Sequence, residues 1–308
     1  MNYSVLEQKI LKTVCYFDLF NFPLTNWEIW RFLYTAKNET LAESNSALTN
    51  LIQIKALDNQ QGFYFLPGRQ EISSIRKERY LIAQKKMRWA LAYAKMIAKL
   101  PFVEAIFICN SLSYLNSKPE SDIDFAIIAR AGHIWTCRFF CASLMALLRR
   151  RPTKKTQKNR LCLSFFVSSE DLNLETVTYP EDIHFTYWLR QFLPIYDPKN
   201  WNKQLDQNNK WLANYIPNFE PTITNSRWMI KSRSLISWLL EKVFYFRFWE
   251  TLFKWGQLKI MPKRLKELAK TQNKNVVFSN TLLKFHDKDN RQEIQKQWLD
   301  KYQKICQN

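Results

Sequence analysis

The sequence predicts an α/β (α+β) protein in which a mixed-sheet core follows a small helical unit and precedes a helical region. Two apolar, β-branched runs, at residues 106–108 and 123–128, are typical of buried strands. The 308 residues are 46% apolar and 15% aromatic, which is enough to build sizeable cores. We expect three domains, over residues 1–69, 70–175 and 176–308.

The first 69 residues predict three helices. An apolar stripe that ends near Phe17 indicates the first helix. Capping boxes, in which a Thr is followed three residues later by a Glu, begin the second helix at Thr25 and the third at Thr40. The expected unit is small but has its own apolar faces to bury.

A hairpin should follow, with strands at Ile54–Leu57 and Phe63–Leu66. Three helices and a hairpin resemble a winged helix, a fold often used on DNA. Yet the third helix, Leu41–Gln53, contains no Lys or Arg, and the unit carries six basic and six acidic side chains. DNA readout is therefore poorly supported, and docking to a partner or to another part of the chain is favoured.

The core begins with a long helix, Glu71–Leu100, which has no Gly or Pro and ends before Pro101. After the first two strands, a helix at His133–Arg150 is apolar around much of its circumference and should be largely buried. A third strand is expected at Leu161–Val167. The core thus contains a β, helix, β arrangement.

Two carboxylates open the second strand of this core. Asp122 and Asp124 are two residues apart, so they project from the same face of the strand, while Ile123 and Phe125 point the other way. Converging carboxylate oxygens suit a divalent cation such as Mg²⁺, which is normally shared with substrate phosphates. Asp122 and Asp124 are therefore the candidate catalytic and metal-binding residues.

These residues resemble the polymerase-β-like nucleotidyltransferases, whose pattern is an apolar strand, Gly-Ser, a spacer and Asp-x-Asp on the next strand. Asn110-Ser111 stands where Gly-Ser is expected, and Asn is the residue other than Gly that most readily adopts a left-handed backbone. The resemblance covers about residues 101–169. It implies that Asn110 and Ser111 hold a nucleoside triphosphate, and that Asp122 and Asp124 hold two Mg²⁺ ions.

The nucleotidyltransferases that this motif resembles carry a third carboxylate. This sequence has no counterpart of it in the motif. No Asp or Glu occurs from Phe125 to Ser169, and the expected third strand offers Ser164 instead. Three interpretations remain open. A substrate or water supplies the missing group, Glu170 or Asp171 reaches back from the strand end, or the domain binds a nucleotide without turnover.

The net charge of +19 is concentrated around the motif. Residues 70–160 carry 18 basic and six acidic side chains, so their field should attract polyanions. We expect Lys118 and the run Arg149, Arg150 and Arg151 to contact phosphates, although such a run is more often a solvated loop. The expected partners are a nucleoside triphosphate and a hydroxyl acceptor, which is a small molecule, a protein or RNA.

The last part of the chain predicts aromatic helices at Glu181–Leu193, Trp201–Tyr215 and Leu235–Leu258. The last of these must be covered, by the rest of the chain, by a partner subunit or by a membrane interface. No run of eighteen apolar residues and no signal segment is evident, so we expect a cytoplasmic protein without a transmembrane segment. His184 and His286 are expected to be packing residues.

Together these features predict an enzyme, a Mg²⁺-dependent nucleotidyltransferase that moves a nucleoside monophosphate from a triphosphate such as ATP to a hydroxyl group. The alternative is a catalytically impaired nucleotide- or nucleic-acid-binding regulator. A third interpretation is a scaffold that binds a membrane surface.

Overall fold

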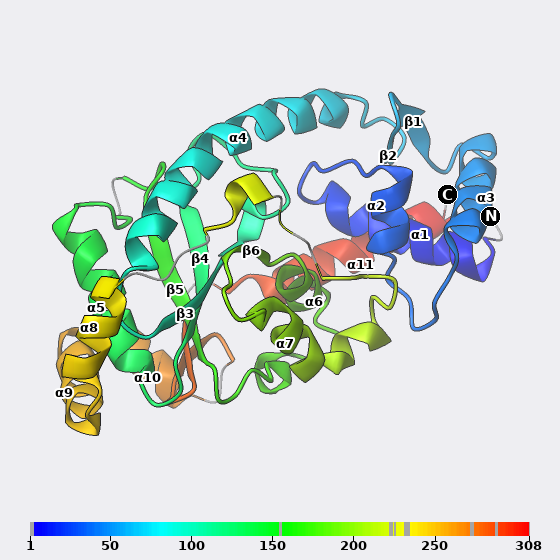
Figure 1. The fold of residues 1–308 in the computed structure, drawn as a ribbon. Helices are drawn as coiled ribbons and strands as arrows, with labels where there is room; N and C mark the ends of the chain where they lie inside the picture. The colour runs from blue at the N-terminus through cyan, green and yellow to red at the C-terminus, as the bar shows by residue number, and fades with distance from the viewer. Residues whose placement is uncertain are drawn as a thin grey trace.

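A computed structural model describes residues 3–153, 156–221, 224, 226–230, 235–271, 274–286 and 289–307. Lys154 and Lys155 of the basic loop lie outside the described residues. The described chain is a mixed α+β protein with eleven α-helices, a six-stranded mixed sheet and a separate two-stranded sheet (Figure 1). The predicted fold class is correct at this level.

The amino-terminal unit contains three helices, α1 (Val5–Asp18), α2 (Asn26–Arg31) and α3 (Leu41–Gln53). A capping box begins each helix, and the three pairs are Ser4 with Glu7, Thr25 with Glu28, and Thr40 with Glu43. In each pair the hydroxyl accepts a backbone N–H of the first turn while the carboxylate accepts the N–H of the capping residue. The predicted starts of α2 and α3 are confirmed.

The hairpin is present, but its first strand begins later in the sequence than predicted. Strands β1 (Asp58–Gln60) and β2 (Phe63–Phe65) pair, whereas the first strand was expected at Ile54–Leu57. The end of α3 uses those residues instead, because the N–H groups of Ala56 and Leu57 both donate to the Leu51 carbonyl. Lys55 takes a left-handed φ of 58° at this helix end.

The six-stranded sheet has the order β6-β3-β4-β5-β8-β7. Strands β4 and β5 are parallel and every other neighbouring pair is antiparallel. The strands are β3 (Val103–Cys109), β4 (Ile123–Ala129), β5 (Leu161–Ser168), β6 (Leu193–Tyr196), β7 (Val276–Phe278) and β8 (Leu282–Phe285). The sheet thus takes three strands from beyond residue 175, where we expected a domain boundary.

Helices cover both faces of this sheet. The long helix α4 (Glu71–Ile97) and α5 (Ile134–Leu147) pack on one face through side chains such as Met87 and Trp135. Helices α6 (Ile183–Arg190) and α7 (Trp201–Asn208) pack on the other face. The central strands are therefore buried on both sides, as their continuous apolar runs indicate.

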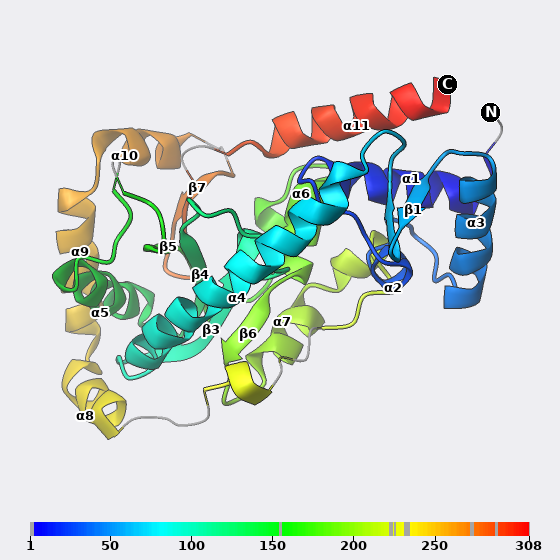
Figure 2. The same ribbon diagram turned by 90° about the horizontal axis from the view of Figure 1, so that it is seen from above.

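The last helices lie at opposite ends of the molecule. Helix α11 (Arg291–Gln307) runs back to the amino-terminal unit and packs on α1 and α6, while α8 (Leu235–Phe244), α9 (Arg247–Ile260) and α10 (Lys263–Lys270) gather at the far end (Figure 2). The single helix expected at Leu235–Leu258 is two helices, because the chain leaves the helical conformation at Tyr245 and Phe246.

Much of the α8–α9 surface is exposed, although its composition predicted a cover. The exposed fractions reach 81% at Leu235, 69% at Phe246 and 61% at Trp255. Among the described residues, no helix has both the length and the apolar character needed to cross a membrane.

Candidate functional site

The candidate site forms where three strands meet at one end of the sheet. In the strand register Cys109 of β3 lies opposite Asp124, and Asp124 lies opposite Cys162 of β5. One ligand atom from each of Asp122, Asp124 and Cys162 lies within 4.8 Å of the other two. No other cluster of this kind occurs in the part of the chain that the structure describes.

The two carboxyl groups are difficult to ionise together. Burial and, next, the charge of the neighbouring Asp122 raise the pKa of Asp124 to about 7, while hydrogen bonds with Asn110 and Cys162 oppose the shift. Burial also raises the pKa of Asp122. A divalent cation would relieve this repulsion, and two carboxylate oxygens are suitable ligands for Mg²⁺. The donor set therefore fits the ion that the sequence predicts, with the Cys162 thiol as a softer neighbour.

Lys86 of α4 organises this end of the sheet, although the motif did not identify it. Lys86 is 2% exposed, and its ammonium group donates to the carbonyls of Pro119 at 3.2 Å and Ser121 at 2.5 Å, and to Asn159 Oδ1 at 3.0 Å. These acceptors lie in the loops that lead into β4 and β5. Lys86 thus holds both strand starts together, and its charge lowers the pKa of Asp122.

Asn110 has the geometry that its place in the motif requires. Its φ is 56°, in the left-handed region that a Gly would otherwise occupy. Its side-chain oxygen accepts a hydrogen bond from Trp188 Nε1 at 2.7 Å. Asn110 and Ser111 line a cavity of about 240 Å³, together with residues of α1 and α6. The backbone that the resemblance assigns to a triphosphate is therefore next to both Asp124 and an open pocket.

A second cavity, of about 220 Å³, connects Asn110 and Trp188 with Lys284 of β8 and with His286, the residue after that strand. His286 Nε2 lies 3.2 Å from Ser164 Oγ, and burial lowers the pKa of this imidazole to about 4. We expected His286 only to pack in a core. The signal that could have found it is its spacing of two residues from Lys284, since side chains two apart on an extended chain point to the same side.

The structure resolves part of the question about the third carboxylate. Glu170 and Asp171 lie past the opposite end of β5, and that end at Ser168 is about 20 Å along the strand from Cys162, so they do not reach the pair. Cys162 lies beside the two aspartates, and Ser164 contacts His286. No third carboxylate joins Asp122 and Asp124 among the residues that are described.

The predicted phosphate-binding cations differ in their surroundings. Lys118 is exposed in the loop before β4, and Arg149 is exposed at the end of α5. The Arg150 guanidinium lies 5.5 Å from the centre of the Trp89 ring on α4. Arg151 lines a larger cavity that also contacts Cys162. Of these four residues, Arg151 shares a cavity with Cys162, a member of the Asp122, Asp124 and Cys162 cluster.

The site therefore combines an ionisable carboxyl pair, a left-handed turn and a neutral imidazole around small pockets. Comparisons of this chain with protein-family models, with curated proteins and with solved structures give no match. The interpretation of the site rests on the positions of its own side chains.

Proposed function

We propose that this protein is a Mg²⁺-dependent nucleotidyltransferase that moves a nucleoside monophosphate from a triphosphate to a hydroxyl acceptor. The observation that carries the proposal is the grouping of Asp122, Asp124 and Cys162 within 4.8 Å at the open end of a sheet. Two carboxylates at this spacing, at the start of one strand, are an arrangement that holds metal ions against phosphates.

The same proposal interprets the finer fold. The order β3, left-handed turn, loop, β4, α5 and β5 supports a polymerase-β-like nucleotidyltransferase core. The three helices and hairpin before it are consistent with a winged-helix-like unit. This unit is bound tightly to the rest of the chain, because Tyr187 Oη donates to the Phe32 carbonyl at 2.7 Å and Trp298 Nε1 donates to the Lys12 carbonyl at 2.8 Å. We therefore favour an intramolecular role for the unit over DNA binding.

In the proposed reaction the acceptor oxygen forms a bond to the α-phosphorus, and the bond to the bridging oxygen of the departing pyrophosphate breaks. Mg²⁺ would neutralise the phosphate charge and orient the leaving group. Asp122 and Asp124 would hold it, and the turn at Asn110 and Ser111 would orient the phosphates. The hydroxyl proton needs a base other than a third carboxylate.

His286 is our candidate for that base. Burial lowers its pKa to about 4, so the imidazole is neutral at pH 7 and is a weak base in the ligand-free protein. The negative charge of a bound triphosphate would raise this pKa and so strengthen the base. The Ser164 hydroxyl at 3.2 Å from Nε2 places the ring beside the strand that carries Cys162. A base at this position would remove the proton from the acceptor hydroxyl. In the nucleotidyltransferases that the motif resembles, the third carboxylate has this role.

The test is transfer of label from each of the four α-labelled nucleoside triphosphates, with Mg²⁺ and a fractionated cell extract as the source of acceptors. Asp124→Asn should reduce transfer roughly 1,000-fold, since a metal ligand contributes several kcal/mol to transition-state stabilisation. Asp171→Asn is the matched control, because this exposed carboxylate lies past the far end of β5. It should retain full activity.

One observation favours the alternative, a nucleotide-binding regulator, because a thiol rather than a carboxylate completes the described cluster. Nucleotide binding that requires Mg²⁺ and Asp124, without transfer from any of the four triphosphates, would support the regulator. Absence of both binding and transfer would overturn both functions.

A further inference from the structure

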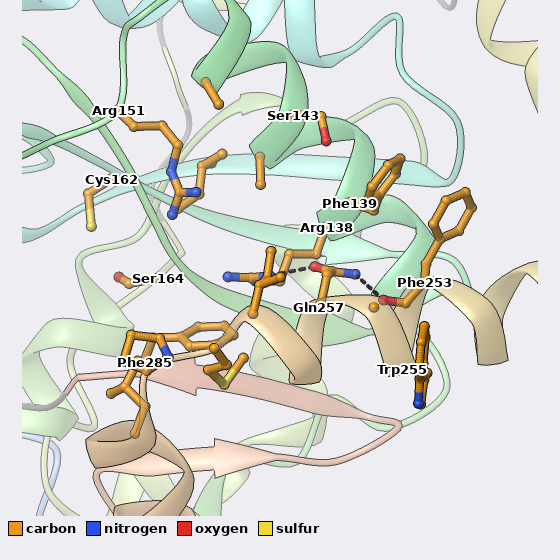
Figure 3. Close-up of a pocket in the computed structure, with 18 of the residues that line it drawn as sticks. Arg138, Phe139, Ser143, Arg151, Cys162, Ser164, Phe253, Trp255, Gln257 and Phe285 are labelled. Atoms are coloured by element: carbon orange, nitrogen blue, oxygen red, sulfur yellow. Dashed lines mark hydrogen bonds between the residues drawn. The ribbon is translucent and has the colours of Figure 1, made fainter.

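A cavity of about 790 Å³ lies between α5, α9 and the start of β5 (Figure 3). Its size is that of a site for a small organic ligand. Most of its wall is apolar and comes from residues such as Phe139, Ala142, Phe253, Ile260, Leu265 and Phe285. Cys162 and Ser164 form its border on β5, so the cavity reaches the strand that carries the candidate metal site.

Gly256 leaves part of this wall open. It lies within α9, where Gly is less favourable than Ala by about 1 kcal/mol. A Cβ placed on Gly256 would meet no heavy atom within 4 Å, so neither crowding nor a left-handed backbone requires Gly here. The open space at this position is available to a ligand.

Two guanidinium groups are the charged part of the wall. Figure 3 shows Arg138 and Arg151 turned toward the same space. Arg138 donates to Gln257 and lies 4.2 Å from the centre of the Phe285 ring, but its Nε has no hydrogen-bond partner among the described residues. Burial and the charge of Arg151 lower the pKa of Arg138 to about 10. An anionic group between the two guanidiniums would accept a hydrogen bond from the buried Arg138 Nε–H and would offset the two positive charges.

We infer that this cavity binds an amphiphile, with its apolar part against α5 and α9 and an anionic group, a phosphate or a carboxylate, at Arg138 and Arg151. The wall continues onto the exposed surface of α9, where Leu252, Trp255 and Ile260 are 40%, 61% and 83% exposed, so a long apolar chain can extend out of the cavity. If the proposed function holds, on which this last step rests, the amphiphile also carries the hydroxyl group that accepts the nucleotide, because Cys162 belongs to both sites.

The test is whether dodecyl phosphate and dodecanoate bind to the full chain. Calorimetry and tryptophan fluorescence measure the binding. Dodecanol and inorganic phosphate, which each carry half of the proposed chemistry, should bind at least tenfold more weakly. Vesicles of phosphatidylcholine with and without phosphatidic acid separate the two sources of the ligand. Cosedimentation only with phosphatidic acid indicates a membrane lipid, and binding of the free amphiphile alone indicates a soluble one.

Gly256→Phe should weaken binding roughly tenfold or more, because the ring occupies the cavity, while the melting temperature stays the same or rises. Thr251→Phe, on the exposed surface of α9, is the matched control. Arg151→Gln should weaken binding of the anionic amphiphiles roughly tenfold, and Arg88→Gln, an equal charge change on the exposed surface of α4, should not.

Failure of both amphiphiles to bind, or equal binding by wild type and Gly256→Phe, would overturn the inference. Equal binding of inorganic phosphate would overturn it as well, because the apolar wall would then contribute nothing. Amphiphile binding without any nucleotidyl transfer would leave this site intact and remove only the proposed reaction. Nucleotidyl transfer without amphiphile binding would overturn the amphiphile site and leave the proposed reaction standing.

Discussion

The pockets on the two sides of β5 differ in how well their polar groups are satisfied. On the His286 side, the Arg291 guanidinium pairs with Asp182 at 2.6 Å and with Asp289 at 2.7 Å, and the cavities are small. On the α9 side, the cavity is more than three times larger, and Arg138 has no carboxylate within 4 Å among the described residues. The first region is arranged to fix side chains in place, whereas the second has room and charge left for a ligand.

Cys162 and the two aspartates stand where these regions meet. Under the proposed function, the polar region would supply the groups that take part in the reaction, and the apolar region would supply the volume that binds the acceptor. Three substitutions test this division.

The largest effect is expected from Asp124→Asn in metal-free protein. The folded-state pKa of Asp124, about 7, lies above its ordinary value of 3.8, so the native state holds the proton more tightly than the unfolded state. The stability of the wild type should therefore fall as the pH rises from about 4 to 7. Above pH 7 the substitution should raise the free energy of unfolding by up to roughly 4 kcal/mol, and near pH 4 it should change little.

Urea unfolding in the presence of a chelator, at pH 4.5 and at pH 8, measures this difference. Mg²⁺ at pH 8 should then stabilise the wild type and leave Asp124→Asn unchanged. A wild type whose stability is constant between these pH values would show that Asp124 is not held in a buried, repulsive pair.

The second prediction concerns the base. His286→Gln should lower the turnover number roughly 100-fold and leave the KM for the triphosphate unchanged, since the ring is assigned to proton transfer and not to binding. His184→Gln is the matched control in the same cavity. Its imidazole Nδ1 lies 2.8 Å from Tyr16 Oη, so we expect lower stability with retained turnover. Equal turnover in His286→Gln and wild type would assign the proton to water or to the substrate.

The smallest effect separates Cys162 from Ser164. Cys162→Asp would add a third carboxylate to the pair, and it should raise Mg²⁺ affinity at pH 8 roughly tenfold. Ser164→Asp should not, because Ser164 faces His286. Calorimetric titration of each variant with Mg²⁺ measures the affinity and distinguishes Cys162→Asp from Ser164→Asp. A larger gain for Ser164→Asp would contradict the strand register that places Cys162 opposite Asp124.

Several features could be predicted because they depend on neighbours in the sequence. The starts of α2 and α3 follow from Thr and Glu three residues apart, and Asp122, immediately before β4, lies close to Asp124 because side chains two apart on an extended chain point to the same side. Asn110 adopts the left-handed backbone that its position in the motif requires. In each case the feature is determined by residues within one or two turns or within a single strand.

Other features depend on contacts between distant segments. Nothing near Leu282–Phe285 indicates that this strand pairs with β5, yet that pairing brings His286 to Ser164 across 122 residues. The Lys86 ammonium likewise reaches loops that begin more than thirty residues later. The α8–α9 composition predicted a cover, but the arrangement of α5 and α9 decided that one side lines a cavity and the other is exposed.

The sequence alone determined the carboxyl pair, the turn before it and the local helices, because these depend on backbone geometry over a few residues. Only the tertiary structure decided which thiol, imidazole and ammonium groups surround the pair and where an open volume remains. Burial and long-range strand pairing set those outcomes, and both are properties of the packed chain as a whole.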